Sequence, residues 1–123
     1  MAEKKQKVVY IATHAGEDPE RATLPFVLGN AALAMDIDVT VALQGPGVFL
    51  AKKGYMENVF AGGLPPLKEL LESFLELGGR LLVCSPCIQD RQIKESDLIE
   101  KSEIMGAALL TQELLEANAS LVY

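Results

Sequence analysis

The sequence predicts an α/β fold, with a mostly parallel sheet of about five strands covered by helices on both faces. Half of the 123 residues are hydrophobic and 23% are charged, which suits a folded chain with its own core and excludes a disordered one. Short β-branched segments alternate with segments in which apolar residues recur every three or four positions. No linker, repeat or low-complexity segment interrupts this alternation, so we expect one domain over residues 1–123.

The first strand and the first helix are expected near the N-terminus. Lys7 to Thr13 (KVVYIAT) is a buried-strand pattern, and a polar loop follows at residues 14–19. The helix begins between Pro19 and Leu24, because Pro25 fits only its first turn or a kink. We predict that one face of this helix carries Leu24, Val27, Leu28, Ala31, Ala32 and Met35.

A second strand and helix follow. Asp38 to Leu43 is a strand, and the turn at 44–47 leads into a short helical segment near 48–53. Residues 55–65 have the glycine and proline content of a loop. Pro66 suits the first turn of a helix that ends at Leu77. Its apolar stripe comprises Leu67, Leu70, Leu71, Phe74 and Leu75.

The C-terminal half supplies the remaining strands. Arg80 to Val83 is a strand that runs directly into the cysteine motif at 84–87. Residues 102–105 form a short strand, 107–117 a helix and 119–122 a last strand. In a parallel sheet, ligands bind beyond the carboxyl ends of the strands. We therefore expect the loops that leave those ends to form the functional site.

Three such loops bring polar residues to one edge of the sheet. They contain His14, the turn Gln44-Gly45-Pro46-Gly47, and the segment from Cys84 to Arg91. His14 is either a base or proton shuttle for a cysteine or a solvated loop residue. The turn lacks the lysine and the spacing of a phosphate-binding loop. We predict that a substrate site is lined by His14, Gln44, Gly45, Gly47 and Ser85.

The motif Cys84-Ser85-Pro86-Cys87 is the strongest chemical signal. If Cys84 ends a strand and Cys87 opens a helix, unpaired helix N–H groups would stabilise a thiolate. Arg91, one helical turn further, would add a positive charge. A stabilised thiolate attacks sulfane sulfur or exchanges with a disulfide. The alternative is that both cysteines are small buried hydrophobes. We favour reactive chemistry, because the pair lies in a predicted polar loop.

Other uses of this motif fit the chain less well. A thioredoxin-like domain places its CxxC after an early strand and faces it with a later proline, whereas here no proline follows Pro86. One CxxC offers two zinc ligands, so a zinc site would have to be shared between subunits. A static structural disulfide is not expected in a cytoplasmic protein. We expect no metal and no cofactor.

Charge and hydropathy argue against some classes of binding partner. The net charge of −6 argues against nucleic acid, and the cluster Lys4, Lys5 and Lys7 is interpreted as a solvated N-terminal overhang. No apolar run reaches the length of a membrane span. The N-terminal MAEKKQK has neither the pattern of a signal peptide nor that of a transit peptide, so we expect a cytoplasmic protein.

The order of these features resembles the DsrE/DsrF-like sulfur-relay family over nearly the whole chain. The resemblance rests on KVVYIAT with GEDPERA, NAALAMDIDVTVAL, GPGVFLAKKG, LKELLESFLELGGRLLVC and CSPCIQDRQIKESDL. It implies a three-layer α/β/α sandwich that assembles into homo-oligomers (trimers or hexamers) or hetero-oligomers with related subunits. In the sulfur-carrier members, a cysteine that matches Cys84 accepts sulfur as a persulfide, and a basic residue matches Arg91. Gln92 and Cys87 depart from those members.

The resemblance implies a sulfurtransferase-type carrier that holds sulfane sulfur on Cys84 and exchanges it with a donor or acceptor protein. Cys87 would gate or resolve the persulfide, and this second thiol opens an alternative: a dithiol oxidoreductase or sulfane-sulfur reductase. A further alternative is a non-catalytic oligomeric module that binds a small ligand. Apolar residues of the 55–65 loop pack either on the core or on a neighbouring subunit: Tyr55, Met56, Val59, Phe60 and Leu64.

Overall fold

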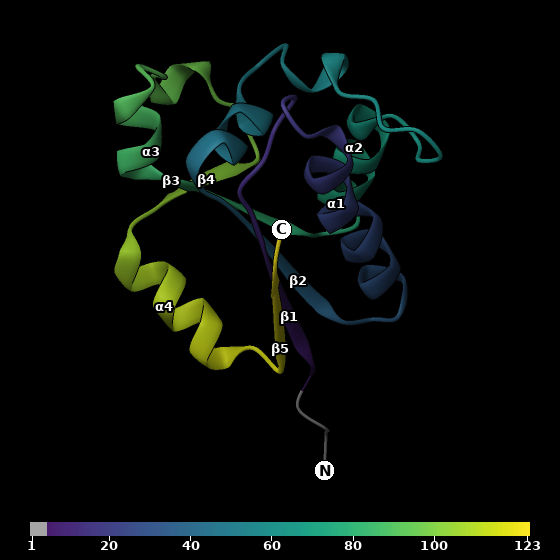
Figure 1. Cartoon of the computed structure of the whole chain (residues 1–123). Helices are drawn as coiled ribbons and strands as arrows, with labels where there is room; N and C mark the ends of the chain where they lie inside the picture. Colours follow the sequence, from purple (N-terminus) through teal and green to yellow (C-terminus); the bar gives the residue numbers. More distant parts are fainter. Residues whose placement is uncertain (1–4) are drawn as a thin grey trace.

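The computed structural model describes residues 5–123, which form a sheet of five parallel strands in the order β4-β3-β2-β1-β5 (Figure 1). This confirms the predicted α/β class. The strands are β1 (Lys7–Ala12), β2 (Asp38–Leu43), β3 (Arg80–Cys84), β4 (Ser102–Met105) and β5 (Ala119–Val122).

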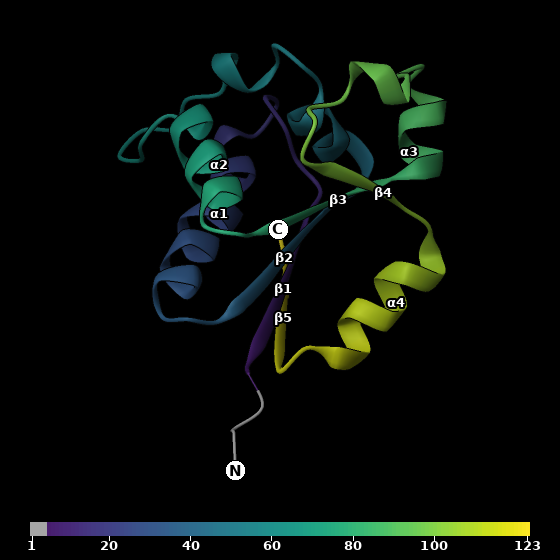
Figure 2. The same ribbon diagram turned by 180° about the vertical axis from the view of Figure 1, so that it is seen from behind.

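Helices cover both faces of the sheet and make three layers (Figures 1 and 2). Helices α1 and α2 lie together on one face, and α3 and α4 lie on the other. The helices are α1 (Pro19–Ala34), α2 (Leu67–Glu76), α3 (Ser85–Asp90) and α4 (Ala107–Glu116). Three 3₁₀ segments complete the described part: η1 (Gly45–Ala51), η2 (Met56–Asn58) and η3 (Glu95–Asp97).

The strand register aligns the carboxyl ends of the central strands. Ala12 of β1 lies beside Leu43 of β2, and Cys84 of β3 lies beside Met105 of β4. Because the strands are parallel, the segments that follow them all leave from the same edge. This edge therefore carries the three segments predicted to form the functional site, which follow β1, β2 and β3.

Between α1, α2 and the sheet, an aromatic pair forms part of the core. The rings of Phe26 and Phe74 are fully buried and meet edge to face, with 5.5 Å between their centroids. A Cβ on Gly29 would lie 3.2 Å from the Phe74 ring, so the helix packs closely on this side. The α2 stripe is confirmed, since Leu67 and Leu71 are buried beside Phe74.

The predicted face of α1 is largely wrong, although its Ala32 is buried and its Leu28 packs against the core. Its buried residues are Ala22, Thr23, Pro25, Phe26, Gly29 and Ala32, whereas Met35 is 70% exposed. Apolar residues surround most of this helix, so periodicity alone does not single out one face. The buried side is the one on which Phe26 contacts Phe74 and on which Gly29 allows close approach to the same ring.

Lys7 is placed differently from a solvated overhang. Lys4 lies outside the described residues. Lys5 pairs with Asp36 and Asp38 at 3.3 and 3.2 Å. Lys7 is the first residue of β1, and its side chain is only 18% exposed because it lies against α4. For Lys7 the overhang interpretation is therefore wrong.

The segment between β2 and α2 is more ordered than a plain turn and loop. The helical segment begins at Gly45, not near Val48, and η2 interrupts the predicted loop. Met56 and Val59 are buried on the core, while Phe60 is 63% exposed. Among residues 5–123 we find no helix with the length and apolar character needed to cross a membrane.

Candidate functional site at the carboxyl edge of the sheet

The two cysteines occupy the junction between β3 and α3. Cys84 is the last residue of the strand, and the helix begins at Ser85, so Cys87 lies in its first turn. The predicted polar loop is thus a direct strand-to-helix junction. The two sulfur atoms lie at disulfide-bonding distance, and the Cα atoms are 5.3 Å apart, inside the usual range for disulfides. Cys84 and Cys87 can therefore react with each other without backbone movement.

A pocket of about 170 Å³ lies beside Cys84, between the sheet and the start of α4. Cys84 is 8% exposed, so access to it runs through this space. The lining comes from the ends of three strands and the beginnings of two helices. It comprises Gln44, Cys84, Pro86, Met105, Gly106, Ala107 and Leu110.

The turn after β2 packs against the cysteine pair. The Gly45 backbone N–H lies 3.3 Å from the Cys87 sulfur and donates a hydrogen bond to it. Gly45 has φ of +54°, in the left-handed region that favours glycine. A Cβ on Gly47 would overlap the carbonyl oxygen of Ala12, so glycine is required there for the turn to reach β1. The structure thus brings Gln44 and Gly45 to the cysteines, while Gly47 contacts the end of β1 and not the sulfurs.

Ser85 begins α3, Arg91 directly follows its last residue, and their side chains make hydrogen bonds to groups other than the sulfurs. The Ser85 hydroxyl accepts a hydrogen bond from Gln89 at 3.4 Å. Arg91 donates to the Cys87 carbonyl oxygen at 3.1 Å and pairs with Asp90 at 3.8 Å. The guanidinium therefore braces the end of this short helix, and its charge acts on Cys87 from the backbone side.

His14 belongs to a separate polar group. Its Nδ1 lies 2.7 Å from a Glu17 carboxylate oxygen, and that carboxylate also accepts the Ala15 N–H. Burial raises the pKa of Glu17, but these hydrogen bonds outweigh it and leave the pKa below its ordinary value. The adjacent Gly16 N–H donates to the Tyr55 hydroxyl at 2.8 Å. His14 thus holds the β1–α1 loop and is not among the residues that line the Cys84 pocket.

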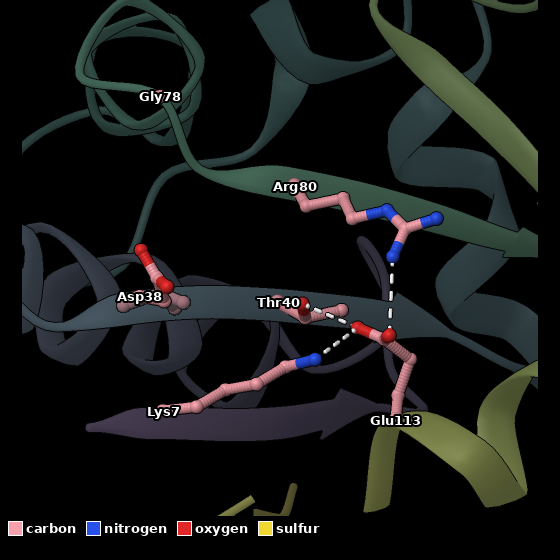
Figure 3. Close-up of a pocket in the computed structure, with 7 residues that line it drawn as sticks. Lys7, Asp38, Thr40, Gly78, Arg80 and Glu113 are labelled. Carbon is pink, nitrogen blue, oxygen red and sulfur yellow. Dashed lines mark hydrogen bonds and ion pairs between the residues drawn. The ribbon is translucent and has the colours of Figure 1, made fainter. Parts of the chain in front are cut away.

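A buried charged cluster lies at the other end of the sheet, beneath α4 (Figure 3). Glu113 has a side chain that is 5% exposed, and three groups converge on its carboxylate. The Thr40 hydroxyl donates at 2.9 Å, the Lys7 ammonium lies at 2.9 Å, and the Arg80 guanidinium lies at 3.1 Å. Arg80 also binds Glu103 at 2.9 Å. Beside the cluster is a cavity of about 230 Å³.

The electrostatics of Glu113 favour its charged form. Burial raises its pKa, but hydrogen bonds from Lys7 and Thr40 and the charges of Lys7 and Arg80 outweigh this, so the pKa lies below the ordinary value. Sequence reasoning missed this cluster. The signal was present, because Glu113 follows the buried Leu110 by one helical turn, where an apolar residue is expected.

Within the described range 5–123, no group of three or more histidine, cysteine or acidic side chains is placed so that it could hold a metal ion.

Comparison with known proteins places this arrangement in a family. The model of the DsrE/DsrF-like family matches residues 6–123. The chain belongs to the DsrE/DsrF-like family. It is 37% identical over 111 residues to the uncharacterized protein MJ0989 of Methanocaldococcus jannaschii, an alignment that covers 90% of each chain. Membership in the DsrE/DsrF-like family suggests a function of the sulfur-relay type.

Solved structures share the fold of this DsrE/DsrF-like chain. The YchN protein of E. coli superposes with a TM-score of 0.81 at 23% identity, covering 96% of this chain and 99% of YchN. MTH1491 of Methanobacterium thermoautotrophicum, a protein of unknown function, superposes with a TM-score of 0.77 at 15% identity, covering 97% and 100%. At these identities the likeness concerns the fold.

Proposed function

We propose that this protein is a sulfur carrier of the sulfurtransferase type, in which Cys84 accepts sulfane sulfur as a persulfide and passes it to a partner. The observation that carries this proposal is the position of Cys84, which ends β3 and lines a pocket at the edge where ligands of parallel sheets bind. Family membership supports the sulfur-relay class.

The residues around Cys84 would have separate roles. Cys87 gates or resolves the persulfide, and the Gly45 N–H holds its sulfur in place. Gln44 lines the pocket, and Gly47 lets the turn approach β1. Arg91 positions Cys87 through its carbonyl oxygen.

The proximity of the two sulfurs favours a second candidate function, that of a sulfane-sulfur reductase. In this reaction the Cys87 thiolate attacks the inner sulfur of the Cys84 persulfide. The bond to the outer sulfur breaks, hydrosulfide leaves with the electron pair, and a Cys84–Cys87 disulfide remains. An external dithiol then reduces the disulfide to two thiols and is itself oxidised.

Intact-protein mass spectrometry after incubation with sodium tetrasulfide tests both functions. A carrier gains about 32 mass units per sulfur, loses them on reduction, and gains none as Cys84→Ser. A reductase loses about two mass units as the disulfide forms and releases sulfide, and Cys87→Ser then traps the persulfide. Labelling that survives in Cys84→Ser and vanishes in Cys87→Ser would overturn the assignment of Cys84. No mass change in any variant would instead favour a small-ligand-binding module.

We also propose that the protein works as a homo-oligomer. Strand β5 is an edge of the sheet, and its Leu121 and Val122 are 50% and 67% exposed. An apolar edge strand is a surface that proteins normally cover. A second copy of the chain is the proposed cover, and light scattering after size-exclusion chromatography measures the assembly directly.

A further inference from the structure

The pocket beside Cys84 limits what can reach the sulfur. Its volume of about 170 Å³ is well below the roughly 300–1,000 Å³ of pockets that take drug-sized ligands. A water molecule occupies about 30 Å³ in the liquid, so the space holds a chain of only a few atoms. Since Cys84 is 8% exposed, a donor has to place its reactive sulfur inside this space.

The lining also selects by chemistry. Within the described chain, the residues that line the pocket carry no formal charge, and Met105 and Leu110 present apolar groups to it. No lysine or arginine is available there to bind the carboxylates of a larger thiol. Sulfur chains are polarisable and weakly solvated, and they suit thioether and aliphatic neighbours.

The start of α4 adds one polar element to this lining. Gly106 precedes the helix and has no side chain that could accept the N–H groups of the first turn. Gly106 and Ala107 both border the pocket, so the partial positive charge of the helix terminus faces the space beside Cys84. This charge complements the terminal sulfur of a deprotonated persulfide.

We propose that the sulfur donor is a small inorganic sulfane-sulfur compound of the polysulfide class, which enters the pocket whole. This inference rests on the proposed function of Cys84. The Cys84 thiolate attacks the terminal sulfur of HS–SₙH, and a new S–S bond forms. The old S–S bond breaks, and its electron pair leaves with HSₙ⁻. The product is Cys84–S–SH, so sulfane sulfur moves without net oxidation or reduction.

The chain offers a matched pair of variants for the test. Gly106 borders the pocket and a Cβ there meets nothing within 4 Å, so Gly106→Val adds bulk at this border without a backbone clash. Gly62 also has nothing within 4 Å of its Cβ position and does not border the pocket, so Gly62→Val is the control. Gly106→Ala gives a smaller step of the same kind, should the valine variant fail to fold.

The experiment measures persulfide formation on Cys84 by mass spectrometry in a Cys87→Ser background, where the persulfide is trapped. The two donors are sodium tetrasulfide and glutathione persulfide. We expect tetrasulfide to label Cys84 at least about tenfold faster, which corresponds to roughly 1.4 kcal/mol of transition-state stabilisation. Gly106→Val should slow labelling by tetrasulfide, with Gly106→Ala intermediate and Gly62→Val unchanged.

The outcomes separate the two proposals. If neither donor adds sulfur to Cys84, the proposed function itself is wrong. If both donors label Cys84 at the same rate, or if Gly106→Val and Gly62→Val label alike while folded, the protein still takes sulfane sulfur but the donor does not enter the pocket. That result overturns the donor assignment alone.

Discussion

Replacing Glu113 with glutamine removes the negative charge beneath α4 while keeping the shape of the side chain. In the folded protein this carboxylate accepts the Thr40 hydroxyl at 2.9 Å and pairs with Lys7 and Arg80 at 2.9 and 3.1 Å. With glutamine, two cations face a neutral amide. We expect the free energy of unfolding to fall, because the cations lose a buried partner for which both were partly desolvated.

The size of the effect follows from the exposure of the partners. A hydrogen bond to a charged group contributes about 1.5–3 kcal/mol, and breaking a fully buried ion pair costs about 3–5 kcal/mol. Lys7 and Arg80 have side chains 18% and 38% exposed, and each keeps a second carboxylate, Glu116 at 3.5 Å and Glu103 at 2.9 Å. Water and these carboxylates recover part of the loss. We therefore expect a cost of about 2 kcal/mol for Glu113→Gln.

Urea unfolding followed by circular dichroism gives the free energy, and thermal melting should show a Tm lower by roughly 6–10 °C. Glu116→Gln is the control, because Glu116 lies one turn along α4 with a side chain 52% exposed. Its effect should stay within about 0.5 kcal/mol. Hydrogen exchange should be faster over residues 107–116 in Glu113→Gln than in Glu116→Gln. Equal stability of Glu113→Gln and the wild type would refute the view that this cluster holds α4 on the sheet.

Three further predictions concern acid stability, the glycine turn and assembly. The folded-state pKa of Glu113 lies below its unfolded value, so the stabilisation from its charge is present above an unfolded pKa of about 4.3 and is lost as pH falls through the folded pKa. In urea titrations below pH 5, the free energy of unfolding should therefore fall less steeply for Glu113→Gln than for the wild type. Parallel curves would contradict this. Gly47→Ala should lower the free energy of unfolding in urea by about 1–3 kcal/mol, because the added Cβ overlaps a backbone oxygen. Gly62→Ala should not destabilise the protein, and equal effects of the two variants would show that the turn is free to shift. Val122→Lys should dissociate the proposed oligomer in light scattering. Met35→Lys, at a site 70% exposed directly after α1, should not, and a monomeric wild type would rule out the assembly.

Several features of the site could be predicted because they depend on local pattern and topology. Alternating strands and helices imply parallel strands, and parallel strands bring their carboxyl ends to one edge. This reasoning alone predicts that Cys84 lies at the end of one strand and that Gln44 follows the strand beside it. His14 also leaves that edge, but its side chain turns to Glu17, three residues along the chain. Topology places backbones, and side-chain direction depends on the nearest hydrogen-bond partner.

The face of α1 and the cluster at Glu113 show where pattern reasoning ends. Helix α1 is apolar on most sides, so its buried face was chosen by the fit of Phe26 against Phe74, which lies far along the chain. Glu113 binds Thr40 across 73 residues of sequence. Hydrophobic periodicity does not predict such a pairing, because the repeat of a strand or a helix describes only one element at a time.

From the sequence alone, the α/β class, the order of most elements and the cysteine pair at the end of the third strand were determined, because each follows from periodicities of a few residues. The tertiary structure alone decided how deeply Cys84 is buried, what shape of space lies beside it and which charges anchor α4. The burial of Cys84 and the space beside it come from β3, β4 and α4 meeting around one pocket. The charges on α4 come from Glu113 meeting Lys7 and Arg80 at the opposite end of the sheet. The packing of elements distant in sequence sets the volume of the pocket and the burial of Cys84, and these two quantities govern which molecules can reach its sulfur.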